Sequence, residues 1–557
     1  MCGIWMYLRG KGAKPEPTQI AAALRALEAR GPEHTAMLDL LAGPSQGDLL
    51  AGPSQGDLPG ISLGFTRLAI NGLTPLGHQP FLSNGTALVC NGEIYNHKEL
   101  AERHGIVVPE GTSDCFVLLP LLEKMTPKEL CRTLDGVFAF VLCDVRTGDV
   151  LVARDPYGVR PLFVATYPDG GLCVASELKG LVPGYAAVAP FPPGTYRRYK
   201  GADGTLLEDC RYHAIPHTPI AYFSYPHHWE AAKSALRSAL TAAVKKRIVC
   251  DRPIGALLSG GVDSSLVASL AAAELRRMGK RLHTFSIGMP ASTDLVYAQK
   301  VADHIGSIHH TIVKTREEFL AAIPDVIRAA ETYDITSVRA SVGNYLVGKY
   351  IRENTDIKVV LNGDGSDEIG GGYLYFYAAP SDEAFEAETE RLLEEIHMYD
   401  VLRSDRGMAA HGLEARTPFL DKNVVATWKS IHSEYRRPRM GTDEKKEMIE
   451  KRVLREAFEA GSILPFEVLY RKKEAFSDGV AGGAEAPWYQ LPDDPTVDLS
   501  VYRDLHNPPK TQEALRYRRI FAEAYGEVSA TTIPHMWMPR FVAGATDPSA
   551  RTLSFYK

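Results

Sequence analysis

The loop at residues 259–265, Ser-Gly-Gly-Val-Asp-Ser-Ser, constrains the fold of this chain more than any other segment. The apolar run before it, residues 254–258, predicts a strand, and the apolar spacing of residues 264–278 predicts a helix that ends before Gly279. Backbone N–H groups converge in such a turn, and the helix dipole favours negative charge, so the loop is predicted to bind phosphate. No lysine follows, which excludes a Walker A loop. Taken alone, the segment could also be a turn that serines cap.

Apolar runs alternate with helical patterns in the second half of the chain, at residues 254–258, 282–287, 309–313 and 357–361. This alternation predicts a doubly wound parallel α/β sheet, and a mainly helical part follows after about residue 380. Ligands bind such a sheet at the carboxyl ends of its strands, where the loops 259–265 and 363–368 lie. Asp263 and Asp367 should therefore lie close together, an arrangement that holds magnesium on a polyphosphate.

The first part of the chain, residues 2–205, carries shorter apolar runs that turn signals interrupt. The predicted strands are residues 87–90, 137–143 and 150–153. Asn91-Gly92 should end the first of them, and a hairpin at 146–149 should join the other two. Because the runs are almost continuously apolar, both faces of each sheet should be covered, by helices at 18–29 and 114–123. We therefore expect an αββα sandwich.

Two segments are predicted to be irregular. Residues 42–58 contain AGPSQGDL twice, on either side of Leu50, and this composition is typical of an exposed loop. Residues 206–230, rich in proline, histidine and aromatic residues, predict a linker between domains at 2–205 and 231–557. The histidines of this linker lack nearby carboxylates and regular spacing, so we expect no metal site there.

Composition excludes several classes of protein. A chain of 557 residues is too long for one core, so two or more domains are expected. The net charge of −6 and the absence of a basic block argue against nucleic-acid and membrane-surface partners, and no apolar run is long enough to span a membrane. Eight cysteines without metal-like spacing, and no signal-peptide pattern, favour a cytoplasmic location. The sequence carries no signal for the oligomeric state, and a homodimer is one assembly compatible with it.

Cys2 indicates a second kind of chemistry. Loss of Met1 would expose Cys2 with a free α-amine, which titrates near ~8 and could act as the base for its own thiol. The thiol would attack an amide or acyl carbon, and Asn91-Gly92 could offer an oxyanion hole from one side-chain amide and one backbone N–H. Charged residues could bind the ends of an amino-acid substrate: Arg67 its carboxylate, and Glu93 and Asp114 its ammonium. Taken singly, these residues have ordinary alternatives, as a core cysteine, a hairpin turn or surface charges.

Together the motifs resemble the glutamine-hydrolysing asparagine synthetases of the class B type, over nearly the whole chain. The motifs similar to that family's N-terminal-nucleophile (Ntn) glutaminase domain are Met1-Cys2-Gly3-Ile4, Arg30-Gly31-Pro32, Arg67-Leu68, residues 91–96 and Asp114. The motifs similar to its ATP-pyrophosphatase domain are residues 259–264, 331–334, 339–341, 365–368, 414–416, 418–421, 473–479 and 547–551. Several ordered motifs in two domains are far more specific than any one alone.

The resemblance implies glutamine hydrolysis in the first domain. Cys2 would form a glutamyl thioester and release ammonia, and Asn91 and Gly92 would take part in catalysis. The residues implied to bind glutamine are Arg67, Leu68, Ala69, Ile70, Asn71, Asn91, Gly92, Glu93 and Asp114.

The resemblance implies asparagine synthesis in the second domain. ATP would adenylylate the side-chain carboxylate of aspartate, and ammonia would attack the β-aspartyl-AMP to give asparagine, AMP and pyrophosphate. The residues implied to bind ATP are Leu257, Ser259, Gly260, Gly261, Asp263, Ser264, Ile287, Asn362 and Gly363. The other implied roles are catalysis for Asp364 and Lys473, aspartate binding for Thr336 and Arg339, and Mg²⁺ binding for Asp263 and Asp367.

The chain departs from the family pattern at several positions. Ala29 and Glu33 replace a histidine and an aspartate, and Ser337 replaces a threonine near the expected aspartate site. Asn362 and Asp364 replace a serine and a glutamate in the loop on the pyrophosphate side. The alternative function is therefore a glutaminase with a weakened or inactive nucleotide-binding synthetase domain. A related β-lactam synthetase is disfavoured, because those enzymes lack the nucleophilic Cys2.

Overall fold

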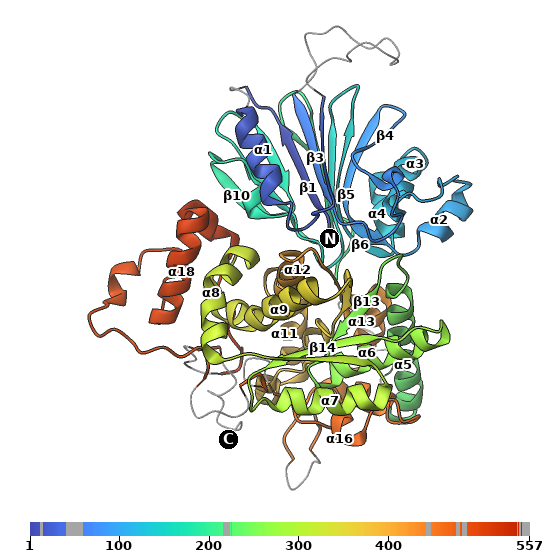
Figure 1. The fold of residues 1–557 in the computed structure, drawn as a ribbon, viewed down its shortest axis with the longest axis vertical. Coiled ribbons are helices and arrows are strands. Elements are labelled where there is room, and N and C mark those ends of the chain that lie inside the picture. Colours follow the sequence, from blue (N-terminus) through green and yellow to red (C-terminus); the bar gives the residue numbers. More distant parts are fainter. Residues whose placement is uncertain are drawn as a thin grey trace. The chain divides into compact units, whose positions relative to one another are not determined.

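The computed structural model describes residues 1–11, 15–40, 60–215, 223, 225–441, 447–474, 479–481, 487–542, 544, 547 and 548. The chain divides into two compact units (Figure 1). The first unit consists of Met1–Ala214, Ala409–Leu413 and Ala522–Thr532, and the second of Ile215–Met408, Glu414–Phe521 and Ile533–Lys557. Within the described residues, no helix combines the length and the apolar character needed to cross a membrane.

Two six-stranded sheets form the first unit, and their strands pair antiparallel. One sheet has the order β10-β8-β9-β1-β3-β2, and its strands are β1 (Gly3–Leu8), β2 (His34–Asp39), β3 (Ile61–Arg67), β8 (Phe163–Thr166), β9 (Leu172–Ala175) and β10 (Ala187–Pro190). The other has the order β12-β11-β7-β6-β5-β4, and its strands are β4 (Phe81–Ser83), β5 (Thr86–Ile94), β6 (Gly136–Asp144), β7 (Val150–Arg154), β11 (Thr195–Tyr199) and β12 (Leu206–Arg211).

Helices cover the outer faces of these sheets (Figure 1). The core between the sheets contains side chains from both, such as Phe65 of β3 and Val141 of β6. A second core joins β5 and β6 to the helices on their other face. The helices of this unit are α1 (Pro17–Ala26), α2 (His97–His104), α3 (Leu118–Leu122) and α4 (Pro127–Thr133). The predicted αββα sandwich is therefore confirmed.

The prediction that Asn91-Gly92 ends a strand was wrong. β5 runs through both residues, because Asn91 pairs with Ala139 and Gly92 with Phe138 of β6. A Cβ atom at position 92 would lie 2.5 Å from the carbonyl oxygen of Val137, so glycine is needed here for the close approach of β6 rather than for a turn. Pairing with a neighbouring strand thus overrides the local turn signal. The hairpin predicted between β6 and β7 is confirmed.

The segment predicted as a linker is partly regular structure. Residues Leu206–Arg211 form β12, which pairs with β11, and α5 begins at Trp229. Residues 216–222 and 224 of this segment, and the whole repeat at 42–58, lie outside the described residues.

A five-stranded parallel sheet organises the second unit, in the order β15-β14-β13-β16-β17. Its strands are β13 (Ile254–Leu257), β14 (His283–Gly288), β15 (Ile308–Val313), β16 (Val359–Leu361) and β17 (Glu414–Arg416). In Figure 1, α7 and α9 lie on opposite sides of β14, and both contact it. The doubly wound sheet is as predicted, except that the edge strand β17 was not recognised in the helical part of the sequence.

Helices make up most of the remaining structure of the second unit, as predicted. The longer ones are α5 (Trp229–Arg247), α6 (Val262–Arg277), α7 (Thr293–Ile305), α8 (Arg316–Ala330), α9 (Ile335–Asn354), α11 (Asp382–Glu395), α12 (Asp400–Ala409), α13 (Lys422–Lys429) and α18 (Gln512–Tyr525). The last residue of α12 and the last four residues of α18 are assigned to the first unit. The shorter ones are α10 (Ser366–Gly370), α14 (Ser433–Arg436), α15 (Arg452–Ala457) and α16 (Phe466–Leu469).

Candidate active sites

Cys2 lies immediately before β1, and three other segments hold it. Its backbone N–H donates to Oδ1 of Asn91 at 3.1 Å, and its thiol donates to the carbonyl oxygen of Leu68 at 3.6 Å. Arg30 Nε donates to the carbonyl oxygen of Cys2 at 2.9 Å. The nitrogen that would become the α-amine after removal of Met1 is therefore already oriented by the Asn91 side chain.

Asn91 also presents a donor that suits an oxyanion hole. Its side chain is fully buried, and among the described residues its Nδ2 has no hydrogen-bond partner. A buried amide without a partner is uncommon and costs stability unless a ligand or water satisfies it. Oδ1 of the same amide accepts from the Cys2 backbone N–H, so this donor belongs to a side chain that contacts the proposed nucleophile, as an oxyanion hole requires.

The residues expected to bind glutamine lie on β3, on β5 and in the segments that follow these strands, and two of them, Leu68 and Asn91, contact Cys2. The Arg67 guanidinium is positioned by the carbonyl oxygens of Thr74, at 2.9 Å from Nη1, and of Gly72. Asn71 Nδ2 donates to Glu93 Oε2 at 2.6 Å, and Asp114 Oδ2 accepts from the Ile94 N–H at 2.6 Å. These carboxylates are buried, as an ammonium-binding site requires.

Glu33 supports the segment at residues 67–71. Its carboxylate accepts from the Ala69 N–H at 2.7 Å, and Leu68, Ala69 and Ile70 are all buried. The glutamate that stands in place of the usual aspartate thus has a structural partner next to Cys2.

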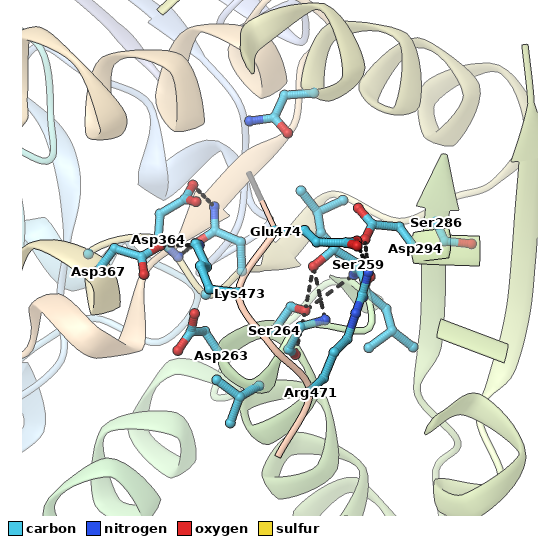
Figure 2. Close-up of a pocket in the computed structure, with 18 of the residues that line it drawn as sticks. Ser259, Asp263, Ser264, Ser286, Asp294, Asp364, Asp367, Arg471, Lys473 and Glu474 are labelled. Atoms are coloured by element: carbon cyan, nitrogen blue, oxygen red, sulfur yellow. Dashed lines mark hydrogen bonds and ion pairs between the residues drawn. The ribbon is translucent and has the colours of Figure 1, made fainter. Parts of the chain in front are cut away.

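A cavity in the second unit lies at the carboxyl ends of β13 and β16 (Figure 2). The winding of the sheet reverses between these two strands, and ligands bind open α/β sheets at such a switch point. Predicted ATP and metal residues that line the cavity are Leu257, Ser259, Gly261, Asp263, Ser264, Ile287, Asn362, Gly363 and Asp367. Asp364 and Lys473 line it as well.

The loop after β13 leaves a helix N-terminus open toward the cavity. Gly261 is the N-cap of α6 and makes no side-chain cap, and the hydroxyl oxygens of Ser259 and Ser264 lie 3.0 Å apart. Gly260 has φ +73°, and a Cβ atom there would lie 2.5 Å from Cβ of Tyr297. A Cβ atom at Gly363 would lie 2.7 Å from the Ser264 nitrogen. These glycines allow the two loops to approach closely and leave N–H groups available for an anion.

Two lysines neutralise the two aspartates of this cavity. Lys451 Nζ lies 2.6 Å from Asp263 Oδ2 and 2.5 Å from Asp367 Oδ1, and Lys473 Nζ lies 2.6 Å from Asp367 Oδ2. Burial alone would raise the pKa of Asp367, but Lys451 and Lys473 hold it far below its ordinary value. Burial likewise opposes protonation of Lys473, but Asp367 and Asp263 raise its pKa, so it remains a cation. The Asp367 carboxylate therefore stays ionised beside the two lysines.

This donor set fits magnesium bound together with a polyphosphate. Mg²⁺ is usually held by one or two carboxylates while phosphates and water fill its other positions. Asp263 and Asp367 converge on the single Lys451 ammonium, so a cation at that point would touch both. Among the described residues, no cluster of three or more acidic, histidine or cysteine side chains could hold a metal without phosphate.

Asp364 is held within the cavity wall. The Asn362 amide donates to Asp364 Oδ2 at 2.9 Å, and Arg403 Nη2 lies 3.4 Å from Asp364 Oδ1. Burial, together with nearby Asp400, raises the pKa of Asp364, although Arg403 opposes this shift. The two residues that depart from the family pattern in this loop therefore contact each other.

Comparisons with known proteins identify the family of the chain. The asparagine synthase family matches residues 235–387 and 378–539, and the glutamine amidotransferase domain family matches residues 51–212. The glutamine-hydrolysing asparagine synthetases of Pongo abelii and Cricetulus griseus are each 44% identical to this chain over 524 residues, covering 89% of it and 91% of theirs. That of Homo sapiens is 43% identical with the same coverage. The chain belongs to the glutamine-hydrolysing asparagine synthetase family.

Solved structures add little to this assignment. The glutamine phosphoribosylpyrophosphate (PRPP) amidotransferase from B. subtilis complexed with ADP and GMP has a TM-score of 0.30 and 18% identity, covering 56% of this chain and 81% of that chain. This likeness is too low to carry a conclusion.

Two residues that the asparagine synthetase pattern assigns to aspartate, Thr336 and Arg339, are not among the residues that line the cavity. Arg339 Nη2 lies 2.6 Å from Glu513 Oε2 and 2.7 Å from Asp547 Oδ2, and its guanidinium stacks 3.5 Å from the Tyr489 ring centroid. Sequence spacing could not reveal these partners, because they come from the far end of the chain. Gly260, whose role is conformational, does not line the cavity either.

Sequence reasoning missed several other residues that line the cavity. Lys451 carries no local signal, because it stands in a charged helical stretch like many surface lysines. Arg471 donates to the Ser259 carbonyl oxygen at 3.2 Å and pairs with Asp294 at 2.8 Å, and so ties the segment that bears Lys473 to the phosphate loop. Figure 2 shows Arg471, Asp294 and Glu474 on one side of the cavity and Asp263, Asp367 and Lys473 on the other.

Proposed function

We propose that this chain makes asparagine from aspartate, ATP and glutamine, with AMP, pyrophosphate and glutamate as the other products. One observation carries the proposal: a single chain holds Cys2 beside an unsatisfied Asn91 donor and, in its second unit, two paired aspartates at the switch point of a doubly wound sheet. The first is suited to acyl transfer and the second to a polyphosphate.

In the glutaminase reaction, the Cys2 thiol loses its proton to the α-amine and attacks the side-chain amide carbon of glutamine. Asn91 Nδ2 and the Gly92 N–H donate to the oxyanion that forms on the carbonyl oxygen. Ammonia leaves with a proton from the α-ammonium, and water then hydrolyses the thioester to glutamate. Arg67 binds the glutamine carboxylate, and Glu93 and Asp114 bind its ammonium; the buried, fixed positions of these three side chains support this assignment.

In the synthetase reaction, a side-chain carboxylate oxygen of aspartate attacks the α-phosphorus of ATP and pyrophosphate leaves. Lys473 and the open N-terminus of α6 stabilise the charge that accumulates on the phosphates. Asp263 and Asp367 would hold Mg²⁺, which when bound supplies further positive charge on the polyphosphate. Ammonia then attacks the acyl carbon of β-aspartyl-AMP and AMP leaves. The raised pKa of Asp364 suits it to accept a proton from the attacking nitrogen.

We retain Thr336 and Arg339 as proposed aspartate contacts. Arg339 already binds two carboxylates, so it has the geometry that a substrate carboxylate needs, and aspartate would take the place of Asp547. Arg339→Lys, which loses the bidentate fork, should raise the KM for aspartate without changing glutaminase activity.

The glutaminase-only alternative depends on Asp364. Because Asn362 and Arg403 keep the Asp364 carboxylate in the cavity wall, its shorter side chain gives little reason to regard the site as inactive. Product analysis tests the choice directly. With aspartate, glutamine, ATP and magnesium we expect asparagine and AMP in equal amounts, whereas glutamate without AMP would support the alternative.

The proposed function also covers the domains, the binding partners, the location and the oligomeric state of the enzyme. We assign glutaminase activity to residues 2–205 and synthetase activity to residues 231–557, with small molecules rather than nucleic acids as partners. A cytoplasmic location and a homodimer are further proposals, and light scattering of the purified protein measures the latter.

A further inference from the structure

Lys451 combines two unfavourable features. It is the N-cap of α15 with φ 55° and ψ 30°, a left-handed conformation that residues with a Cβ rarely adopt. Its side chain is only 1% exposed, although burial of an ammonium is costly without compensating charges. Such features persist where the surroundings require a particular group at a particular point.

The Lys451 ammonium lies between carboxylates from two different loops. It is 2.6 Å from Asp263, in the loop after β13, and 2.5 Å from Asp367, in the loop after β16. The absence of a side chain at Gly372 makes room for it, since a Cβ atom there would lie 2.1 Å from Lys451 Cε and 2.1 Å from Asp367 Oδ1. With Lys473 on the other oxygen of Asp367, two carboxylates and two ammoniums form a cluster without net charge.

We propose that Lys451 is a positioning residue that holds Asp263 and Asp367 in place and competes with free divalent cations, so that magnesium binds only together with a polyphosphate. This inference rests on the proposed function, in which Asp263 and Asp367 bind the magnesium of ATP.

The charge balance gives the reason. The cluster has no net charge, so it attracts a free divalent cation only weakly. The Asp263 and Asp367 oxygens that could bind the cation already contact the Lys451 ammonium. A polyphosphate brings negative charge, offers Lys451 new acceptors and releases the carboxylate oxygens toward the cation. The enzyme would thereby avoid filling its phosphate site with metal alone.

Binding of Mn²⁺, followed by electron paramagnetic resonance without turnover, tests this inference. The parent enzyme should bind Mn²⁺ weakly alone and tightly with a non-hydrolysable ATP analogue. Lys451→Met should bind Mn²⁺ at least about tenfold more tightly than the parent in the absence of nucleotide, because a competing positive charge is gone. Lys451→Arg, which keeps the charge, should resemble the parent.

Two further variants control the experiment. Lys429 is also buried, and its Nζ lies 2.5 Å from Glu386 and 3.5 Å from Glu390. Lys429→Met should lower the melting temperature in the same way but leave Mn²⁺ binding unchanged. Adding Asp263→Asn to Lys451→Met should abolish the gained Mn²⁺ site and so locate it.

The inference would be overturned if the parent bound Mn²⁺ tightly without nucleotide and Asp263→Asn removed that binding. Unchanged Mn²⁺ binding in Lys451→Met would do the same. If Lys451→Met does not fold, the parent and Lys451→Arg titrations still decide the question. A parent that forms no asparagine would instead contradict the proposed function, and the Mn²⁺ titration would still report on Lys451.

Discussion

At the scale of single residues, Asp364 shows how a shortened side chain can remain part of a site. Its carboxylate receives a hydrogen bond from Asn362 at 2.9 Å. The amide nitrogen reaches one bond farther than a serine hydroxyl, and aspartate reaches one methylene less far than glutamate. We therefore expect the two departures from the family pattern to compensate each other.

Asp364→Glu alone should not improve asparagine synthesis, because the longer side chain must displace the Asn362 amide. Displacements of about 1 Å at a catalytic group can lower the rate on the order of a hundredfold. The double variant Asn362→Ser with Asp364→Glu should match or exceed the parent. Asparagine and pyrophosphate formation by the parent, both single variants and the double variant measures this. An inactive parent that Asp364→Glu alone restores would contradict the expectation.

Asp294 should make stability depend on pH. Burial raises its pKa to about 6, despite the opposing effect of Arg471. The native state therefore holds a proton that the unfolded chain releases near its ordinary pKa, so the contribution of Asp294 to stability falls as pH rises toward and through about 6. The free energy of unfolding of Asp294→Asn, relative to that of the parent, should be about 1 kcal/mol greater at pH 7.5 than at pH 5. Thermal melting at both pH values measures the gain, and a difference that does not change with pH would argue against it.

At the scale of elements, α6 is flanked by two glycines, Gly260 and Gly279, with nearly equal φ angles but different surroundings. Gly260, just before the helix, has φ +73° and is pressed against Tyr297. Gly279, just after it, has φ +71° and has no atom within 4 Å of the position where a Cβ would lie. Substitutions at these two glycines therefore distinguish the effect of backbone strain from that of a steric clash in the loop at residues 259–265.

Gly279→Ala should cost about 1–2 kcal/mol of stability from the left-handed backbone alone and leave synthesis unchanged. Gly260→Ala should cost more, and should lower synthesis on the order of a hundredfold because the loop must move. Melting temperatures and AMP formation measure both variants. Equal effects of the two substitutions would show that backbone strain, and not the close contact with Tyr297, causes the loss of stability and activity.

At the scale of the whole molecule, the two sites belong to units with separate cores. The proposed nucleophile lies in an αββα sandwich and the proposed phosphate-binding loop at residues 259–265 follows a strand of a parallel sheet, and no residue that we propose for one reaction is proposed for the other. Each reaction should therefore be removable without loss of the other.

Cys2→Ala should abolish asparagine formation from glutamine and leave formation from ammonium chloride largely intact. The variant lacks the thiol but keeps every residue around Asp263 and Asp367. Asparagine formed from each nitrogen source measures the split. Loss of the ammonia-dependent activity in a folded variant would contradict the assignment of two independent sites.

Local patterns predicted the elements that carry most of the chemistry. The apolar run and glycines around Ser259 identified β13, the phosphate loop and α6, and the second loop after β16 followed from the rule for parallel sheets. Local patterns gave wrong predictions of secondary structure where pairing with residues distant in the sequence determines the strand. Asn91-Gly92 has the composition of a turn but lies in β5, and β17 is too short, with three residues, to have a period of its own.

The sequence by itself indicated the two chemistries through the combination of its motifs, because Cys2 and the loop at residues 259–265 each have an ordinary alternative when taken alone. It also determined the sandwich and the doubly wound sheet, through the spacing of apolar residues. Only the tertiary structure decided which charged and polar groups meet: Lys451 lies between Asp263 and Asp367, Asn362 donates to Asp364, and Arg339 pairs with Glu513 and Asp547. A buried charge is stable only beside its partner, and apart from Asn362 and Asp364 those partners are far apart in the sequence, so no local pattern can reveal them.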